Sequence, residues 1–145
     1  MTDFKIKKIT EADFEKLFVL FKEFADFEER KFSNSLQRMK AEKDFFSGFL
    51  AKDAAGNILA YAIFFYSYHT FTGKTLYMDD LFVLEPYRRK GLGRKLLEAV
   101  IAEAKKQKCA GVRWQVADWN APAQKLYAAY GALENPEDRN RDIIF

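Results

Sequence analysis

The stretch "YRRKGLGRKLL", Tyr87 to Leu97, places a dense group of positive charges and two glycines immediately before an apolar helical pattern. Glycines let backbone N–H groups turn toward an anion, and the start of a helix adds a partial positive charge. Basic side chains at this end oppose the helix dipole, a conflict that a bound phosphate would offset. The stretch therefore predicts an anion site where a strand turns into a helix. A glycine turn among solvated charges is the alternative.

This turn departs from three familiar phosphate loops. It lacks the Gly-Lys-Ser/Thr ending of a Walker loop, and Leu96 stands where a dinucleotide fingerprint needs its third glycine. The partners of a kinase glycine loop are also missing from the sequence. What remains is Arg88-x-x-Gly91-x-Gly93, followed by a helix that we expect to reach about Lys108. The apolar stripe of that helix consists of Leu92, Leu96, Leu97, Val100, Ile101 and Ala104.

The composition is that of a globular protein with one domain over residues 1–145. The net charge of +3 does not favour a nucleic-acid or membrane partner, and the longest apolar run, Leu59 to Tyr66, is too short to cross a membrane. The one cysteine excludes an intramolecular disulfide and fits a reducing compartment. Since the sequence also shows no signal peptide, we expect a cytoplasmic protein.

Apolar periodicity predicts a mixed α/β fold with one central sheet. The first half pairs strands through a hairpin that turns at 55–57, and the second half alternates strand and helix, which favours a parallel crossover. The expected strands cover residues 4–9, the two arms of 48–69, 74–83, 111–118 and 141–145, and the other expected helices start at Thr10 or cover 36–46 and 120–131.

In this order the features resemble the GNAT acyltransferases. Arg-x-x-Gly-x-Gly between the strand "LYMDDLFV" and a helix is similar to their acetyl-CoA pyrophosphate loop. The segments "FFYSYHTFTGKTLYMDDLFV" and "GVRWQVADWNAPAQKLYAAYGA" resemble the spermidine/spermine and thialysine acetyltransferase subgroup. The resemblance covers most of Phe4 to Ala132. It implies a single GNAT-like domain, a mixed sheet with helices on both faces, and direct acetyl transfer from acetyl-CoA to an amine without a metal or an acyl-enzyme.

For acetyl-CoA binding, the resemblance implies the end of the strand before the loop, the loop itself and the start of the last helix. The segment "DWNAP" by itself predicts that Asn120 caps a helix with Pro122 in its first turn. The resemblance adds a hydrogen bond from this helix start to the pantetheine arm. The implied residues are Leu81, Phe82, Val83, Arg88, Arg89, Lys90, Gly91, Leu92, Gly93, Arg94, Asn120, Ala121, Pro122 and Ala123.

Acetyl transfer to an amine with a pKa of about 10.4 requires that the amine lose a proton, and the departing thiolate benefits from a proton donor. The resemblance gives the donor role to Tyr127, seven residues after Asn120 and so on the same helical face. Tyr130 is the reserve candidate, and a packing aromatic is the structural alternative.

Asp79 and Asp80 are unusual in the middle of an apolar strand. Successive side chains of a strand face opposite ways, so we expect at most one of them to point into a given site. We expect Asp79 to serve as the base, directly or through a water, with Asp80 or water alone as alternatives. The alternative is that neither aspartate is catalytic, with one exposed at the end of the sheet and the other capping a local bulge.

For the acceptor, the resemblance implies Phe27 and Glu28 at the end of the first helix, together with Asp79. The tyrosine hydroxyl expected at position 27 is missing. An acidic group attracts a cationic amine, although a solvated helix end is the alternative. The implied strand beside the acceptor contributes Arg113, Trp114 and Gln115. With one His and one Cys in the chain, neither a thiol–imidazole pair (Cys109 with His69) nor a metal site is favoured.

The expected acceptor is a small primary amine, either a diamine or polyamine or a lysine-like amino acid. The alternatives are a protein lysine or N-terminus and a CoA-binding module without catalysis. The acidic "DFEE" cluster argues against nucleic-acid binding through the basic loop. The resemblance implies a homodimer. The diamine enzymes continue beyond the last expected strand into a segment that contributes to their dimer and acceptor site, and this sequence does not indicate what replaces it.

Overall fold

The computed structural model describes residues 3–135 and 141–145. The chain divides into a first unit, Met1–Gln115, and a second unit, Val116–Phe145, and each is described by itself. The first unit contains the sheet and three α-helices, and the second contains the helix α4 (Ala121–Ala129).

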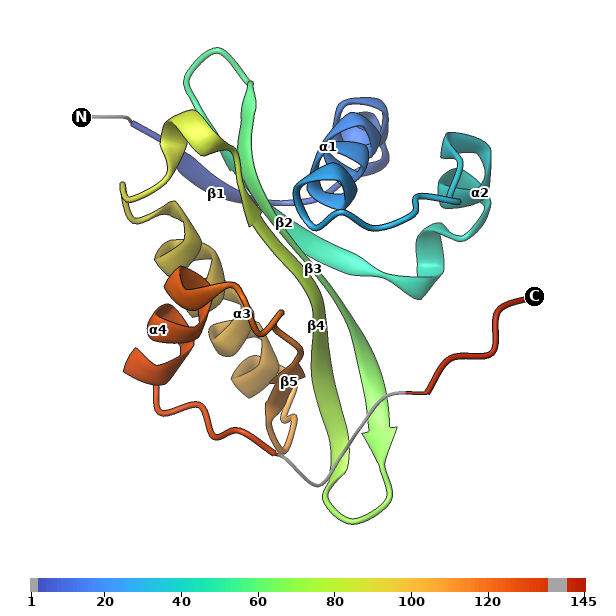
Figure 1. Cartoon of the computed structure of the whole chain (residues 1–145), viewed down its shortest axis with the longest axis vertical. Helices are drawn as coiled ribbons and strands as arrows, with labels where there is room; N and C mark the ends of the chain where they lie inside the picture. Colours follow the sequence, from blue (N-terminus) through green and yellow to red (C-terminus); the bar gives the residue numbers. More distant parts are fainter. Residues whose placement is uncertain (1–2, 136–140) are drawn as a thin grey trace. The chain divides into compact units, whose positions relative to one another are not determined.

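A five-stranded mixed sheet of order β1-β2-β3-β4-β5 forms the centre of the first unit (Figure 1). The first four strands pair antiparallel, and the fifth joins the fourth in parallel. The predicted parallel crossover is therefore confirmed. The strands are β1 (Lys5–Lys8), β2 (Ser47–Lys52), β3 (Ile58–His69), β4 (Gly73–Val83) and β5 (Val112–Trp114).

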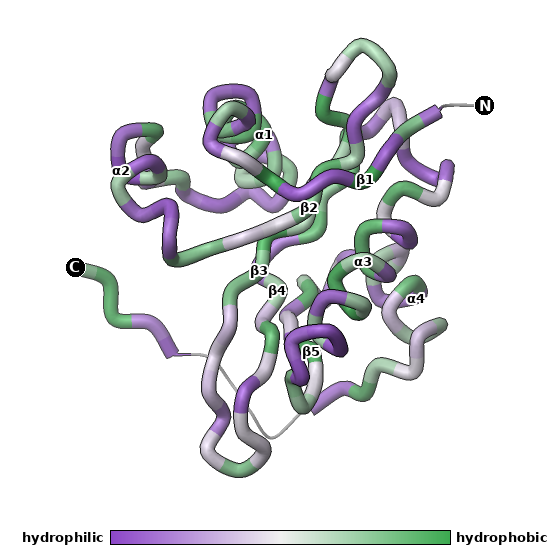
Figure 2. Tube along the Cα trace, turned by 180° about the vertical axis from the view of Figure 1, so that it is seen from behind, coloured by the Kyte–Doolittle hydropathy of each residue, from purple (hydrophilic) through white to green (hydrophobic). Residues whose placement is uncertain are grey.

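Helices cover both faces of this sheet, as expected from the resemblance (Figure 1). On one face α1 (Phe14–Phe27) packs beside α2 (Leu36–Ala41), and on the other α3 (Leu92–Lys106) packs on β1 to β4. Figure 2 shows the hydrophobic colour concentrated along the central strands, between these helices. The core on the α1 face consists of Phe14, Leu17, Met39, Leu50, Ile58, Tyr61, Ile63 and Phe82.

Local sequence features explain where these elements begin. A 3-10 turn, Glu11–Asp13, precedes α1, and the Thr10 backbone N–H donates a hydrogen bond of 2.9 Å to the Asp13 carboxylate. The hairpin between β2 and β3 turns at Gly56, whose φ of 83° is readily available only to glycine. Both predictions are confirmed. The stripe predicted for α3 is also confirmed, since every member except Ile101 is buried.

Three expectations about elements need correction. The helix expected over 36–46 is interrupted, because α2 ends at Ala41 and a 3-10 turn, Lys43–Phe45, leads to an extended Phe46 that stacks on Phe14 at 5.5 Å. The strand expected over 111–118 is shorter, since β5 ends at Trp114. The strand expected over 141–145 is wrong. Its residues are exposed and pair with no strand among the described residues, and a strand needs a neighbour for its hydrogen bonds.

Across residues 3–135 and 141–145, every helix is too short or too polar to cross a membrane.

Candidate active site

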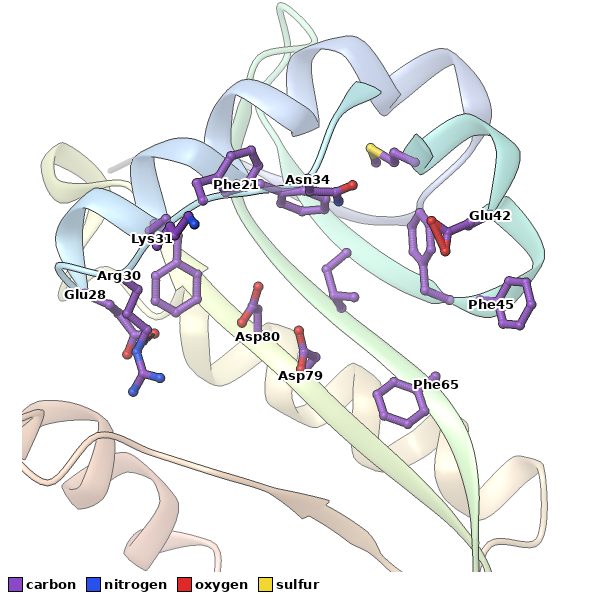
Figure 3. Close-up of a pocket in the computed structure, with 16 residues that line it drawn as sticks. Phe21, Glu28, Arg30, Lys31, Asn34, Glu42, Phe45, Phe65, Asp79 and Asp80 are labelled. Atoms are coloured by element: carbon purple, nitrogen blue, oxygen red, sulfur yellow. Dashed lines mark ion pairs between the residues drawn. The ribbon is translucent and has the colours of Figure 1, made fainter. Parts of the chain in front are cut away.

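The strand β4 carries a β-bulge at Asp79. Ile63 pairs with Asp80 while the next residue, Phe64, pairs with Met78, so Asp79 is an extra residue in the ladder. Bulges re-aim side chains and are frequent beside active sites. Both aspartates line the same pocket, as Figure 3 shows. The expectation that only one of them could point into a given site was wrong, because the extra residue breaks the alternation of side chains.

We call this cavity the aspartate pocket. It has a volume of about 490 Å³ and lies between β3 and β4 on one side and the α1–α2 region on the other (Figure 3). Six phenylalanines give it a largely aromatic wall, and charged side chains of both signs converge on it. The polar lining residues are Glu28, Arg30, Lys31, Asn34, Glu42, Asp79 and Asp80, and the apolar ones are Phe21, Phe24, Ala25, Phe32, Met39, Phe45, Phe46, Ile63 and Phe65.

Asp80 is the most perturbed acid in this pocket. Burial, followed by the negative charges of Asp79 and Glu28, raises the pKa of Asp80 to about 7, against an opposing effect of Arg30. Burial also raises the pKa of Asp79, but this side chain keeps contact with solvent, so we ascribe no stability effect to it. A carboxyl whose pKa lies near 7 takes up and releases a proton at physiological pH. Asp80 therefore has the properties of a general base.

The end of α1 forms one side of the aspartate pocket. Glu28 caps the helix and lies 3.7 Å from the guanidinium of Arg30, in an ion pair whose glutamate is mostly shielded from solvent. Phe27, expected in the acceptor site, does not line this pocket. Its ring instead faces Phe82 at 6.0 Å between centroids, and the Arg88 guanidinium lies over it at 4.6 Å.

Beyond the bulge, β4 has a free edge. The pairing of β5 with β4 stops at Met78, and the described residues add no further strand there. The Leu84 N–H donates to the carbonyl of Leu59 in β3. Residues of an antiparallel strand direct their backbone groups alternately toward and away from the neighbouring strand. The backbone groups of Phe82 therefore point toward β3, and those of Leu81 and Val83 point away from it. The outward groups of Leu81 and the outward N–H of Val83 fit the expected role of this segment in holding an extended ligand. The Val83 carbonyl already accepts a hydrogen bond from Arg88, and Phe82 contributes its ring to the core.

The glycine turn has the predicted form. Gly91 is the N-cap of α3 with φ 85°, and Arg89 also adopts a left-handed conformation at φ 62°. No side chain of the described residues lies within 4 Å of the position that a Cβ on Gly91 would take, which leaves the backbone approachable. The Arg88 Nε–H donates a 2.8 Å hydrogen bond to the carbonyl of Val83, and the expected role of Arg88 as a phosphate ligand stays a prediction.

In the second unit, Asn120 caps α4 as predicted. Its side-chain oxygen accepts a hydrogen bond of 3.3 Å from the Ala123 N–H, and Pro122 lies in the first turn. Tyr127 is buried on α4, and Tyr130 ends that helix. The roles expected for Asn120 toward pantetheine and for Tyr127 as the acid stay predictions.

The predicted acceptor strand does not reach the aspartate pocket. Arg113 and Trp114 pair with Tyr77 and Met78 of β4, Gln115 follows β5, and none of the three lines the pocket. Contact of these residues with an acceptor stays a prediction.

Sequence reasoning missed the basic pair Arg30 and Lys31, and "EERK" directly after the first helix was the available clue. It also missed Asn34 and Glu42, which no motif marks. The described residues contain no group of three or more potential metal ligands.

Together the fold and this geometry define a class of enzyme. A glycine turn suited to phosphates, a free strand edge and a pocket with a poised carboxylate are what an acyl-CoA-dependent N-acyltransferase requires. Residues 7–132 match the model of the Acetyltransferase (GNAT) family, and the chain belongs to this family. It is accordingly an acetyl-CoA-dependent N-acetyltransferase.

Named relatives agree with this assignment. The chain is 33% identical over 134 residues to a thialysine N-ε-acetyltransferase of Caenorhabditis elegans, an alignment covering 88% of this chain and 81% of the relative. It is 29% identical over 150 residues to the enzyme of the same name from Mus musculus, covering 94% and 88%. A crystal structure of a predicted acetyltransferase with acetyl-CoA from Clostridium acetobutylicum shares the fold, with a TM-score of 0.80, 16% identity and coverage of 97% and 96%.

Proposed function

We propose that the chain acetylates the side-chain amine of a small, lysine-like amino acid that binds in the aspartate pocket. The observation that carries this proposal is the pairing of opposite charges in one cavity. Asp79 and Asp80 lie in the middle of β4, and Arg30 and Lys31 follow the end of α1 (Figure 3). An acceptor with an ammonium group and a carboxylate can satisfy both sets of charges.

A diamine or polyamine is the second candidate, and it remains favoured by the acidic residues. Glu28 and Glu42 line the same pocket, which gives it four carboxylates against two cations. However, Arg30 pairs with Glu28 and partly neutralises it. A second ammonium group would then approach Lys31 without full compensation. The names of the thialysine relatives support the amino-acid reading.

For the donor, we propose that acetyl-CoA lies along the free edge of β4 with its pyrophosphate on the glycine turn. The thioester supplies the acetyl group. The outward backbone groups of Leu81 and the outward N–H of Val83 suit the amides of an extended pantetheine arm. The N–H groups at the start of α3, with exposed Arg89, Lys90 and Arg94, suit a doubly charged phosphate ligand. Asn120 to Ala123 contribute at the start of α4.

For the chemistry, we propose that an aspartate of the bulge accepts the proton of the acceptor ammonium, directly or through one water. Asp79 was expected in this role from the sequence, but the raised pKa of Asp80 makes Asp80 the better proton acceptor at neutral pH. The free amine then attacks the thioester carbonyl, and the C–S bond breaks as Tyr127 protonates the departing thiolate. The second proton of the attacking nitrogen then restores the Tyr127 hydroxyl, which leaves the neutral amide and free CoA thiol. Water is the alternative donor.

Thiol release from acetyl-CoA, measured with a panel of acceptors, tests the proposal. Lysine, ornithine and thialysine should be used several-fold better than the matching diamines, which lack only the carboxylate. Lys31→Gln should raise KM for the amino acids and leave KM for the diamines unchanged or lower. Lys40→Gln, which removes an exposed cation paired with Glu15 outside the pocket, is the matched control. A preference of the wild-type chain for diamines, or an amino-acid KM that Lys31→Gln leaves unchanged, would overturn the amino-acid reading.

We further propose a single catalytic domain over residues 1–145, a homodimer and a cytoplasmic location. The family match over residues 7–132 supports one domain, and the subgroup resemblance supports the dimer. Sedimentation of the purified chain tests the oligomeric state. A protein lysine as the acceptor would be recognised by turnover of peptides above that of free lysine.

A further inference from the structure

We infer that Arg88 is a positioning residue for the acceptor side of the site rather than a ligand of the CoA pyrophosphate. This inference rests on the proposed function of the aspartate pocket. It concerns the first residue of the Arg-x-x-Gly-x-Gly turn, whose sequence position suggested phosphate binding.

The contacts of Arg88 point back toward the sheet. Its Nε–H donates to the Val83 carbonyl at 2.8 Å, and its guanidinium carbon lies 4.6 Å from the ring centroid of Phe27 and 5.6 Å from that of Phe82. An arginine that stacks on two rings and donates to a carbonyl has its planar group fixed in orientation. The following residue, Arg89, is exposed and extends the basic turn.

The rings of Phe27 and Phe82 do not line the aspartate pocket, but each is connected to a residue that does. Phe82 stacks on Phe24 at 4.8 Å with an interplanar angle of 8°, and Phe24 lines the pocket. Phe27 is the last residue of α1, and the next residue, Glu28, also lines the pocket. Arg88 thus ties the end of β4 to the last turn of α1 from outside the cavity.

Two consequences follow from this connection. Loss of the guanidinium would loosen the last turn of α1, where the Glu28 N–H donates to the Phe24 carbonyl at 2.9 Å. The Glu28 side chain would then be held less firmly beside Asp80, whose proton affinity it raises. The defect would therefore be felt by the acceptor, while the backbone N–H groups of the glycine turn would still bind CoA.

Arg88→Gln and Arg88→Lys, compared with Arg89→Gln, test the inference. Binding of CoA is measured by calorimetry without an acceptor, and KM and kcat are measured for the best amine. We expect Arg88→Gln to change the Kd for CoA by less than about threefold and to raise the acceptor KM by roughly three- to tenfold, as expected for a partly buried cation–π contact. Arg88→Lys keeps the charge but loses the planar stacking, so it should show the same acceptor defect. Arg89→Gln should show the reverse pattern.

A second variant guards against simple misfolding. Phe27→Leu keeps Arg88 but removes its ring partner, and it should raise the acceptor KM as Arg88→Gln does. In the double variant Phe27→Leu/Arg88→Gln, the acceptor KM should rise no further than in either single variant. Hydrogen exchange at the Glu28 amide should accelerate in Arg88→Gln, a readout that does not depend on turnover. If Arg88→Gln weakens CoA binding tenfold or more, or if its effect adds fully to that of Phe27→Leu, the inference is wrong. If the wild-type chain turns over no amine, the proposed function fails, and the CoA and exchange measurements still decide the role of Arg88.

Discussion

Replacing Asp80 by asparagine should make the protein more stable and less active, and both effects should depend on pH. The carboxyl has a pKa of about 7 in the folded chain against 3.8 as its ordinary value. The folded state therefore holds an extra proton between these two pH values, and folding stability falls as pH rises through that window. Asparagine carries no charge and lacks this penalty, so the variant should gain most above pH 7.

The size of the gain follows from the shift. A pKa difference of one unit corresponds to about 1.4 kcal/mol, so the full shift would be worth roughly 4 kcal/mol. The aspartate pocket is open to water and Arg30 offsets part of the charge, so we expect about 1–2 kcal/mol. Urea unfolding gives the free energy of unfolding of the wild type and of Asp80→Asn at pH 5 and at pH 8. The gain is the amount by which the difference between the two chains grows from pH 5 to pH 8. Asp26→Asn, on the exposed side of α1, is the control for the substitution itself.

Kinetics provide the second half of this test. In the wild type, kcat/KM for the acceptor should rise with pH through about 7 as Asp80 ionises, and this inflection should disappear in Asp80→Asn. Asp79→Asn should keep the inflection and move it to lower pH, because the Asp79 charge raises the pKa of Asp80. An Asp80→Asn chain that is destabilised equally at both pH values would refute the reasoning. Loss of the inflection in Asp79→Asn alone would assign the base to Asp79.

Three further predictions concern the donor site, the acid and the pocket rim. Gly91→Val should weaken CoA binding by about tenfold, because a side chain would cover the backbone of the turn. Gly56→Val, at a similar positive φ in the β2–β3 turn, should share its loss of stability in thermal melts but leave CoA binding intact, and equal CoA affinity in both variants would move the cofactor elsewhere. Tyr127→Phe should lower kcat by roughly 10²–10⁴-fold with little change in CoA affinity, and unchanged kcat would transfer the role to Tyr130 or water. Glu28→Gln should raise KM for a diamine by less than about fivefold, because Arg30 already pairs with this carboxylate, and a lysine-like acceptor should be insensitive.

Sequence reasoning succeeded where a single residue fixes the local backbone. Gly91 and Gly56 take left-handed conformations that their turns require, and the Asn120 cap follows from a side-chain oxygen within reach of the helix start. The same reasoning failed at Asp79 and Asp80, since alternation assumes a regular ladder and the bulge depends on pairing with β3.

Other parts of the site depend on contacts distant in sequence. The aspartate pocket combines residues after α1 with the middle of β4, and no local pattern specifies that Arg30 and Asp80 line the same cavity. The motif predicts phosphate binding for Arg88 but gives no sign of its contacts with Phe27 and Val83, which come from two other elements. A motif indicates the conformation of the chain, whereas the direction of a long side chain is decided by what surrounds it.

The β-bulge at Asp79 is the insertion of a single residue into an otherwise regular pairing of β3 and β4. Deleting Asp79 would leave Met78 and Asp80 adjacent, opposite Phe64 and Ile63, which are already adjacent in β3. Every other pair would keep its partner and its face, so the hairpin could close into an uninterrupted ladder with one carboxylate fewer. A single inserted codon in a regular β-hairpin is thus sufficient to create a two-carboxylate site. Such an insertion would leave the hydrophobic faces of both strands unchanged, which makes it an accessible evolutionary step from a structural strand to a catalytic one.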